Sequence, residues 1–199
     1  MIEIIVASGN KHKITEIKHI LNELDVNVKS VYEITNEYDE PLENGETFED
    51  NAYIKAAAIR NLFPNCYVLA DDSGLMVEAL NGDPGVHSAR YAGEQHNDAD
   101  NNALLIKNMS NVAEDKRSAK FVSVLCLIEP DGKVNNFRGE CEGKIIYEKR
   151  GDNGFGYDPY FLPNGEVKTF AEMLEEDKNM ISHRKKALEK LMAYLKENI

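Results

Sequence analysis

One stretch constrains the fold of this chain more than any other: a short apolar run that leads directly into two adjacent acids. Residues 66–70 (Cys-Tyr-Val-Leu-Ala) are typical of a buried strand, and Asp71-Asp72-Ser73-Gly74 follows at once. A buried strand that ends in carboxylates places them at the mouth of a sheet, where open α/β sheets bind ligands. Adjacent carboxylates repel each other, so solvent, a metal or a cation has to balance them. The same pair could instead cap a following turn or helix.

The turn between the first strand and the first helix has the composition of an anion site. Residues 2–7 are typical of a buried strand, and apolar residues at helical spacing follow from Ile14 to Leu24. A polar, glycine-containing turn into a helix directs backbone N–H groups at phosphate oxygens, and lysines add charge. The Walker spacing is absent, and such residues are also common in ordinary turns. The turn contains Ser8, Gly9, Asn10, Lys11, His12 and Lys13.

An acidic loop and a helix precede the acid pair. Residues 35–46 are rich in acids, including Glu43, and are expected to form an exposed loop. A variant of the capping box spans residues 47–50 and begins a helix. Asn51 and Lys55 share one face of this helix because they lie four residues apart. They either face solvent or point into the same cleft as the acids.

The middle of the chain contains further strands and one helix. A turn signal covers residues 81–85, and Pro130-Asp131-Gly132 is a strong hairpin signal, so the two strands that flank it should be antiparallel. Arg90 lies in a polar and aromatic setting that suits either a phosphate or a surface salt bridge. We expect strands at residues 26–32, 75–80, 119–128 and 134–146, and a helix at residues 98–109.

The last two candidate segments are a glycine-rich loop and the basic first turn of the C-terminal helix. Residues 151–161 contain glycines and a proline, so they form neither a regular helix nor a central strand. Aromatic side chains on such a loop either stack on a planar base or pack into the core. Ser182 should cap a last helix that buries leucines at positions 188, 191 and 195. Its basic first turn opposes the helix macrodipole, and such a local conflict is often found at functional sites.

Charge and composition narrow the classes of function. The net charge of −12 disfavours binding to polymeric nucleic acid, but a small polyphosphate remains possible if a divalent cation offsets the acids. No apolar run is long enough to span a bilayer, and no signal peptide is present, so we expect a cytoplasmic protein without membrane contact. Three cysteines without metal-ligand spacing indicate reduced thiols.

Six motifs, in chain order, resemble those of the inosine triphosphate pyrophosphatase family, also called XTP/dITP diphosphatases. They run from near the N-terminus into the last helix, and six in the right order are highly specific although any one could arise by chance. The motifs are Ser8-Gly9-Asn10-x-x-Lys13, Thr47-Phe48-x-x-Asn51-Ala52-x-x-Lys55-Ala56, Ala70-Asp71-Asp72-Ser73-Gly74-Leu75, Gly82-x-Pro84-Gly85-Val86-x-Ser88-Ala89-Arg90-Tyr91, Gly154-Phe155-Gly156-Tyr157-Asp158-Pro159, and Lys178-x-x-x-Ser182-His183-Arg184 with Ala187-Leu188.

The resemblance implies a role for each candidate residue. Asp72 would accept the proton and also bind Mg²⁺, with Glu43 as a further metal ligand. Lys55 would add positive charge at the phosphates. The triphosphate would be cradled by Ser8, Gly9, Asn10, Lys11, His12 and Lys13, although Lys11 and His12 fall where the family's pattern is open. Ser73 and Arg90 would contact substrate, Phe155, Gly156, Tyr157 and Asp158 would enclose the base, and Lys178, His183 and Arg184 would read its edge.

The resemblance also implies a fold and a reaction. The fold is α/β, with an elongated, long, mixed and twisted β-sheet flanked by helices, two lobes and a deep active-site cleft, as one domain over residues 1–199 and usually as a homodimer. The reaction is hydrolysis of ITP, dITP or XTP between the α- and β-phosphates, which releases pyrophosphate. Because a carboxylate that holds a metal is a poor base, the division of roles among Asp71, Asp72 and Glu43 stays open.

Other functions remain as alternatives. A receiver-like regulatory domain would carry its acid pair just after the first strand, where this chain has Ser8-Gly9-Asn10. A nucleotide sensor would bind without turnover. A phosphatase that removes the terminal phosphate, or a pyrophosphatase for other modified nucleotides, would share much of the same site.

Overall fold

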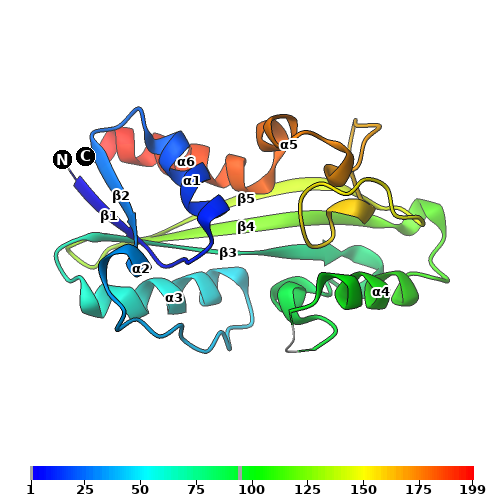
Figure 1. The fold of residues 1–199 in the computed structure, drawn as a ribbon, viewed down its shortest axis with the longest axis horizontal. Helices are drawn as coiled ribbons and strands as arrows, with labels where there is room; N and C mark the ends of the chain where they lie inside the picture. The colour runs from blue at the N-terminus through cyan, green and yellow to red at the C-terminus, as the bar shows by residue number, and fades with distance from the viewer. Residues whose placement is uncertain (1, 94–95) are drawn as a thin grey trace. The chain divides into compact units, whose positions relative to one another are not determined.

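The computed structural model describes residues 2–93 and 96–199, without the side chain of His12. It contains a mixed six-stranded open sheet flanked by helices, with the strand order β2-β1-β3-β4-β5-β6 (Figure 1), which confirms the expected fold class. Within those ranges, no helix combines the length and apolar character needed to cross a membrane. The strands are β1 (Ile2–Val6), β2 (Val26–Ser30), β3 (Tyr67–Val77), β4 (Ser118–Ile128), β5 (Val134–Ile145) and β6 (Phe161–Pro163).

The described part of the chain contains six α-helices and five 3₁₀-helices, which lie between the strands or follow the last one. The α-helices are α1 (Lys11–Leu21), α2 (Val31–Ile34), α3 (Phe48–Leu62), α4 (Asp98–Asn108), α5 (Glu175–Ile181) and α6 (His183–Asn198) in the described part of the chain. The 3₁₀-helices there are η1 (Glu78–Leu80), η2 (Gly85–Arg90), η3 (Glu114–Lys116), η4 (Asp158–Tyr160) and η5 (Phe170–Glu172).

The chain forms two compact units. Unit 1 comprises the chain up to Asp72, Ser123–Gly139 and Lys186–Ile199. Unit 2 comprises Ser73–Val122 and Glu140–Lys185. Strands β3, β4 and β5 each contribute residues to both units. A single domain with two lobes, an elongated shape and a deep cleft stay predictions.

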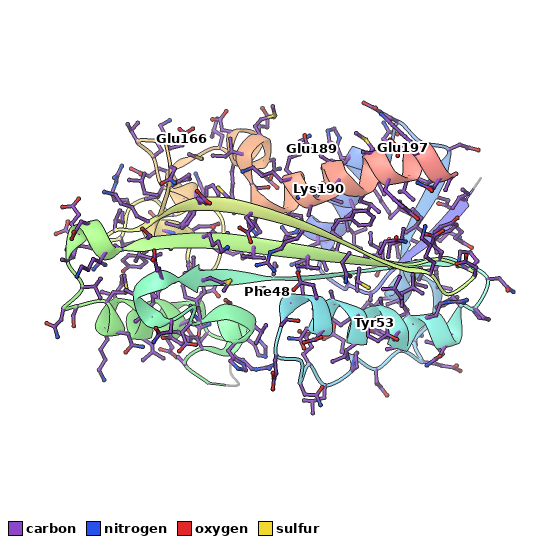
Figure 2. The ribbon with its side chains drawn as sticks, turned by 180° about the vertical axis from the view of Figure 1, so that it is seen from behind. Phe48, Tyr53, Glu166, Glu189, Lys190 and Glu197 are labelled. Atoms are coloured by element: carbon purple, nitrogen blue, oxygen red, sulfur yellow. The ribbon has the colours of Figure 1, made fainter. Side chains whose placement is uncertain are left out.

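In unit 1, helices cover both faces of the sheet. Strand β1 pairs in parallel with β2 and with β3. Successive strand residues point to opposite faces of the sheet. Ile4 of β1 and Leu69 of β3 point to the face that α1 and α6 cover, and they pack with both helices in one apolar cluster. Figure 1 shows α3 on the side of β3 away from α1 and α6. On α3, Phe48 is buried and Tyr53 is half exposed (Figure 2). The predicted leucines at positions 188, 191 and 195 are all buried.

Strand β2 is shorter than the sequence suggested. It ends at Ser30 instead of continuing to Tyr32, and the short helix α2 begins there. The reason is a capping box: the Ser30 hydroxyl accepts from the Tyr32 N–H at 3.2 Å, and the Glu33 carboxylate accepts from the Ser30 N–H at 3.1 Å. These bonds satisfy backbone donors that a continued strand would have paired differently.

Unit 2 has its own core. The turn of the predicted hairpin between β4 and β5 belongs to unit 1 and is closed by a hydrogen bond from the Glu129 N–H to the Lys133 carbonyl at 2.9 Å, whereas the other ends of both strands belong to unit 2. Strand β6 pairs antiparallel with β5, with Ile145 opposite Phe161. One apolar cluster joins α4 to these strands. Helix α5, which the sequence patterns did not predict, follows η5.

The three cysteines are free, as expected, and Cys126 and Cys141 are buried.

Candidate active site

The acid pair does not lie in a turn at the end of a strand. Strand β3 runs without a break from Tyr67 to Val77, so Asp71 and Asp72 occupy its middle. This corrects the expected strand end at residue 70 and the separate strand at residues 75–80. Because the side-chain period of a strand is two, adjacent acids point to opposite faces of the sheet. The repulsion expected between neighbouring carboxylates is thereby reduced, and each acid has a separate set of partners.

Asp71 points to the same face as Leu69, where α1 lies. The Lys13 ammonium of α1 contacts its Oδ2 atom at 2.8 Å. The Ser123 hydroxyl of β4 donates to its Oδ1 atom at 2.9 Å. The Asp71 side chain is 1% exposed. A carboxylate this deeply buried is retained because both of its oxygens are engaged by donors.

Asp72 points to the α3 face. The Lys55 ammonium donates to its Oδ1 atom at 2.9 Å and to the Glu43 Oε2 atom at 3.2 Å. The second oxygen of Asp72, Oδ2, is buried and has no hydrogen-bond partner among the described residues. The sequence left two orientations open for Lys55, toward solvent or toward the acids, and the structure turns its side chain to Asp72. Glu43 also arrives at this site, from the acidic loop.

The local charge balance shifts two pKa values. Burial raises the pKa of Asp72 to about 6, with smaller upward contributions from Glu43 and Asp71, although Lys55 acts in the opposite direction. Burial alone would lower the pKa of Lys55, but the surrounding carboxylates outweigh it and raise that pKa. The carboxylates that surround this single ammonium cause the Lys55 shift, whereas burial is the main cause of the Asp72 shift. The site therefore has an excess of negative charge that a further cation would relieve.

The oxygen atoms here suit a hard divalent cation. Asp72 Oδ2 and the Glu43 carboxylate are anionic oxygen donors, and one of them is buried without a partner in the described structure. No group of three or more His, Cys, Asp or Glu side chains is arranged to hold a metal in residues 2–93 and 96–199. Water or substrate oxygens would therefore complete the coordination, as is common for Mg²⁺.

The loop that carries Glu43 is held to α3 by a hydrogen bond from its backbone to a side chain of that helix. The buried Asn51 side chain accepts a hydrogen bond from the Gly45 N–H at 2.8 Å. Helix α3 begins with the predicted capping box between Thr47 and Asp50. Gly45 leaves no room for a side chain, since a Cβ atom there would lie 2.5 Å from the Asp50 Cβ atom. The loop conformation therefore depends on glycine at this position.

We expect Gly45→Ala to lower the free energy of unfolding by about 1–3 kcal/mol, because the added methyl group overpacks the start of α3. Urea denaturation of the full chain measures the change. Glu46→Ala, in the exposed part of the same loop, is the control and should stay within about 0.5 kcal/mol of the parent protein. A Gly45→Ala protein as stable as its parent would contradict this account of the loop.

The predicted anion turn contains several hydrogen bonds of its own. Asn10 directly precedes α1, and its side chain accepts from the Lys13 N–H at 3.2 Å. The Ser8 hydroxyl accepts from the Asn10 N–H at 3.1 Å, and the Ser8 carbonyl accepts from the Ser30 hydroxyl at 2.6 Å. Gly9 and Lys11 are exposed. The side chain of His12, also assigned to this turn, lies outside the described residues.

In unit 2, Asp158 and Lys178 form a buried pair beside an exposed ring. The Lys178 ammonium donates to the Asp158 Oδ2 atom at 2.5 Å, and the Phe155 N–H donates to the same atom at 3.0 Å. The Lys178 ammonium also lies 4.9 Å from the centre of the Phe155 ring, which is 57% exposed. Burial raises the pKa of Asp158, opposed by Lys178. Gly154 permits this arrangement, since a Cβ atom there would overlap Asp158 Oδ2.

The start of α6 places two basic side chains in unit 2. The His183 ring stacks on Phe121, with ring centres 5.0 Å apart and planes at 14°. Arg184 donates to the Ser73 hydroxyl at 3.4 Å. Both basic side chains are buried. Ser182 accepts from the Lys185 N–H at 3.1 Å, which confirms its predicted capping position.

The remaining candidates have different surroundings. Tyr157 is buried in the core, and its hydroxyl donates to the Ser88 carbonyl at 2.6 Å. The Gly156 N–H donates to the Asp98 carboxylate at 2.7 Å. Arg90 ends η2 and is partly buried. Their roles toward a substrate stay predictions.

Sequence reasoning missed Ser123 entirely. It lies in the apolar run of β4 and belongs to none of the six motifs. The only signal available was a single hydroxyl among apolar strand residues, which does not reveal its partner. Unit 1 thus brings together the Lys13, Asp71 and Ser123 side chains on one face of β3, and Lys55, Glu43 and Asp72 on the other. Unit 2 joins Phe155, Asp158 and Lys178, and separately Ser73 and Arg184.

Comparison with known proteins gives consistent matches along the chain. A model of the Ham1 family matches residues 4–194. The chain is 44% identical over 195 residues to a dITP/XTP pyrophosphatase of Oceanobacillus iheyensis, covering 98% of both. It is 46% identical over 191 residues to one of Leuconostoc mesenteroides, covering 95% of this chain and 94% of that protein. The solved structure of the Staphylococcus aureus Ham1 protein has a TM-score of 0.91 and 42% identity, covering 99% of this chain and 100% of the other.

Proposed function

Because the chain belongs to the Ham1 family, we propose that it hydrolyses ITP, dITP and XTP to the nucleoside monophosphate and pyrophosphate. Curated relatives that carry the name dITP/XTP pyrophosphatase match nearly its whole length. The observation that supports this most strongly is the pair of lysine–carboxylate contacts on the two faces of β3, one of them made by the anion turn. In the cell, this activity would keep deaminated purines out of DNA and RNA.

The reaction joins a water oxygen to the α-phosphorus and breaks its bond to the bridging oxygen, so that pyrophosphate leaves with the electron pair. Asp72 accepts the proton of the attacking water, for which its raised pKa and buried Oδ2 atom are suited. Lys13 and the N–H groups of its turn bind the phosphate oxygens. Lys55 stabilises the negative charge that develops during the transfer.

We include Mg²⁺ in this proposal, held by Asp72 and Glu43. The excess of carboxylates around Lys55 and the buried Asp72 Oδ2 atom support a cation at this place. When bound, Mg²⁺ neutralises phosphate charge and helps to orient the triphosphate. Both carboxylates contact the Lys55 ammonium, and the Glu43 side chain is the more exposed of the two.

Base selection is assigned to unit 2. Hypoxanthine and xanthine present a carbonyl at position 6 where adenine presents an amino group, so side-chain donors favour the first two. The donors are Lys178, His183 and Arg184, and Phe155 supplies an exposed ring for stacking. Asp158 supports this role because it fixes the Lys178 ammonium. We also propose that the protein is a homodimer and that it is located in the cytoplasm. Gel filtration with light scattering tests the oligomeric state.

The deciding experiment measures product and substrate preference with purified protein and Mg²⁺. We expect pyrophosphate from ITP, dITP and XTP. ATP should be at least about 100-fold poorer in kcat/KM, because its 6-amino group leaves the buried donors unpaired. GTP should also be much poorer, but guanine shares the 6-carbonyl, so its rejection has to come from the 2-amino group. Orthophosphate as the first product would indicate a phosphatase. Tight binding without turnover would indicate a sensor, and equal rates for ATP and ITP would overturn the assigned selectivity.

A further inference from the structure

Ser123 carries the one hydroxyl in the otherwise apolar run of residues 121–128 in β4, and it is fully buried. Its only described partner is the Oδ1 atom of Asp71, at 2.9 Å. A buried hydroxyl is costly unless it is hydrogen-bonded, and a valine or alanine would satisfy the packing without it. We infer that Ser123 is a positioning residue which, through Asp71, holds the Lys13 ammonium in place for the phosphates of the substrate. The inference rests on the proposed function of the anion turn.

The contacts form a chain from the sheet interior to the turn. Asp71 is 1% exposed, and its other oxygen contacts the Lys13 ammonium at 2.8 Å. The Lys13 side chain is 19% exposed and arises from the first turn of α1. A lysine has a long flexible stem and no fixed geometry of its own. A carboxylate held by a second donor gives it one position, because charge-assisted hydrogen bonds are strong and directional.

This arrangement separates the roles of the two adjacent acids. Asp71 uses one oxygen for Ser123 and the other for Lys13. Asp72 uses one oxygen for Lys55 and keeps a buried oxygen without a described partner. A group that accepts a proton or a cation needs such an available oxygen. The geometry therefore makes Asp72 the reacting carboxylate and Asp71 a support for the phosphate-binding lysine.

The test compares binding of inorganic pyrophosphate to four full-length proteins by calorimetry in the presence of Mg²⁺. They are the parent, Ser123→Ala, Lys13→Met and the double variant. We expect Ser123→Ala to weaken binding about tenfold, the size typical for loss of a hydrogen bond to a charged group. In the Lys13→Met background, Ser123→Ala should cause no further loss. An equal loss in both backgrounds, or no loss in the single variant, would overturn the inference.

Two further variants separate positioning from general destabilisation. Cys126→Ala removes another buried group from the same strand and should leave pyrophosphate binding unchanged. Ser123→Cys keeps the size of the side chain but donates weakly, so its loss of binding should lie between the parent and Ser123→Ala. If Ser123→Ala does not fold, Ser123→Cys carries the comparison. A Ser123→Cys protein that binds as the parent does would count against the inference.

A ligand-free measurement keeps this inference distinct from the proposed function. Brief labelling with acetic anhydride, followed by mass spectrometry, reports how readily each lysine reacts. We expect Lys13 to react several-fold faster in Ser123→Ala than in the parent, with Lys55 unchanged as an internal reference. An unchanged Lys13 rate would overturn the inference. If the parent protein neither hydrolyses deaminated purine triphosphates nor binds pyrophosphate, the proposed function fails, and the labelling result still decides the role of Ser123.

Discussion

Asp72→Asn lowers kcat for ITP by about 10³-fold or more, because asparagine keeps the shape of the side chain but cannot accept the proton of the attacking water. The parent carboxylate is suited to that role, since its Oδ2 atom is buried without a described partner and burial raises its pKa to about 6. Steady-state release of pyrophosphate measures the effect. Asp39→Asn, in the exposed acidic loop, is the matched control and should retain parental activity. Full activity of Asp72→Asn would refute the assigned role.

A second prediction for Asp72→Asn concerns the pH dependence of its unfolding free energy, measured with a chelator present so that no metal is bound. A carboxyl whose folded pKa is raised contributes stability below its unfolded pKa of about 4, and this contribution is lost as pH rises through about 6. Asparagine does not titrate. The unfolding free energy of Asp72→Asn relative to the parent should therefore rise by about 2–3 kcal/mol between pH 4 and pH 7. Parallel pH profiles for the two proteins would show that the Asp72 pKa is not raised.

Lys55→Met lowers kcat/KM for ITP by about 10²–10³-fold, because in the proposed mechanism it removes a fixed positive charge beside the phosphate group under attack. It also lowers the free energy of unfolding at pH 8 by about 3 kcal/mol, since the carboxylates of Asp72 and Glu43 lose their shared ammonium. The loss of stability should shrink toward pH 5, where Asp72 can become neutral by taking up a proton.

Lys196→Met is the matched control for that variant. Its ammonium lies 3.0 Å from Glu23, but both side chains are well exposed, so solvent screens the pair. Activity and stability should stay near the parental values at every pH. If Lys55→Met shows the small effects expected of Lys196→Met, then the contact with Asp72 and Glu43 is only a surface salt bridge in energetic terms.

Local patterns predicted most secondary structure because their causes lie within a few residues. The capping box that begins α3, the hairpin between β4 and β5, and the leucine face of α6 all follow from short-range rules. The predicted end of β3 at residue 70 was wrong because Asp71, Asp72 and Gly74 are all unfavourable in a strand. Sequence reasoning also missed α5, which has no side-chain cap at its first residue.

The sequence by itself determined that two acids, an anion turn, an aromatic loop and a basic helix start occur in an order that resembles one enzyme family. Only the tertiary structure decided which groups the two acids contact. A polar segment can continue through a buried strand when distant groups compensate for its burial, and here those groups are Lys13, Lys55 and Ser123. Their separation from β3 along the chain hides the pairing from any local pattern. Because side chains alternate along a strand, Asp71 faces Lys13 and Asp72 faces Lys55.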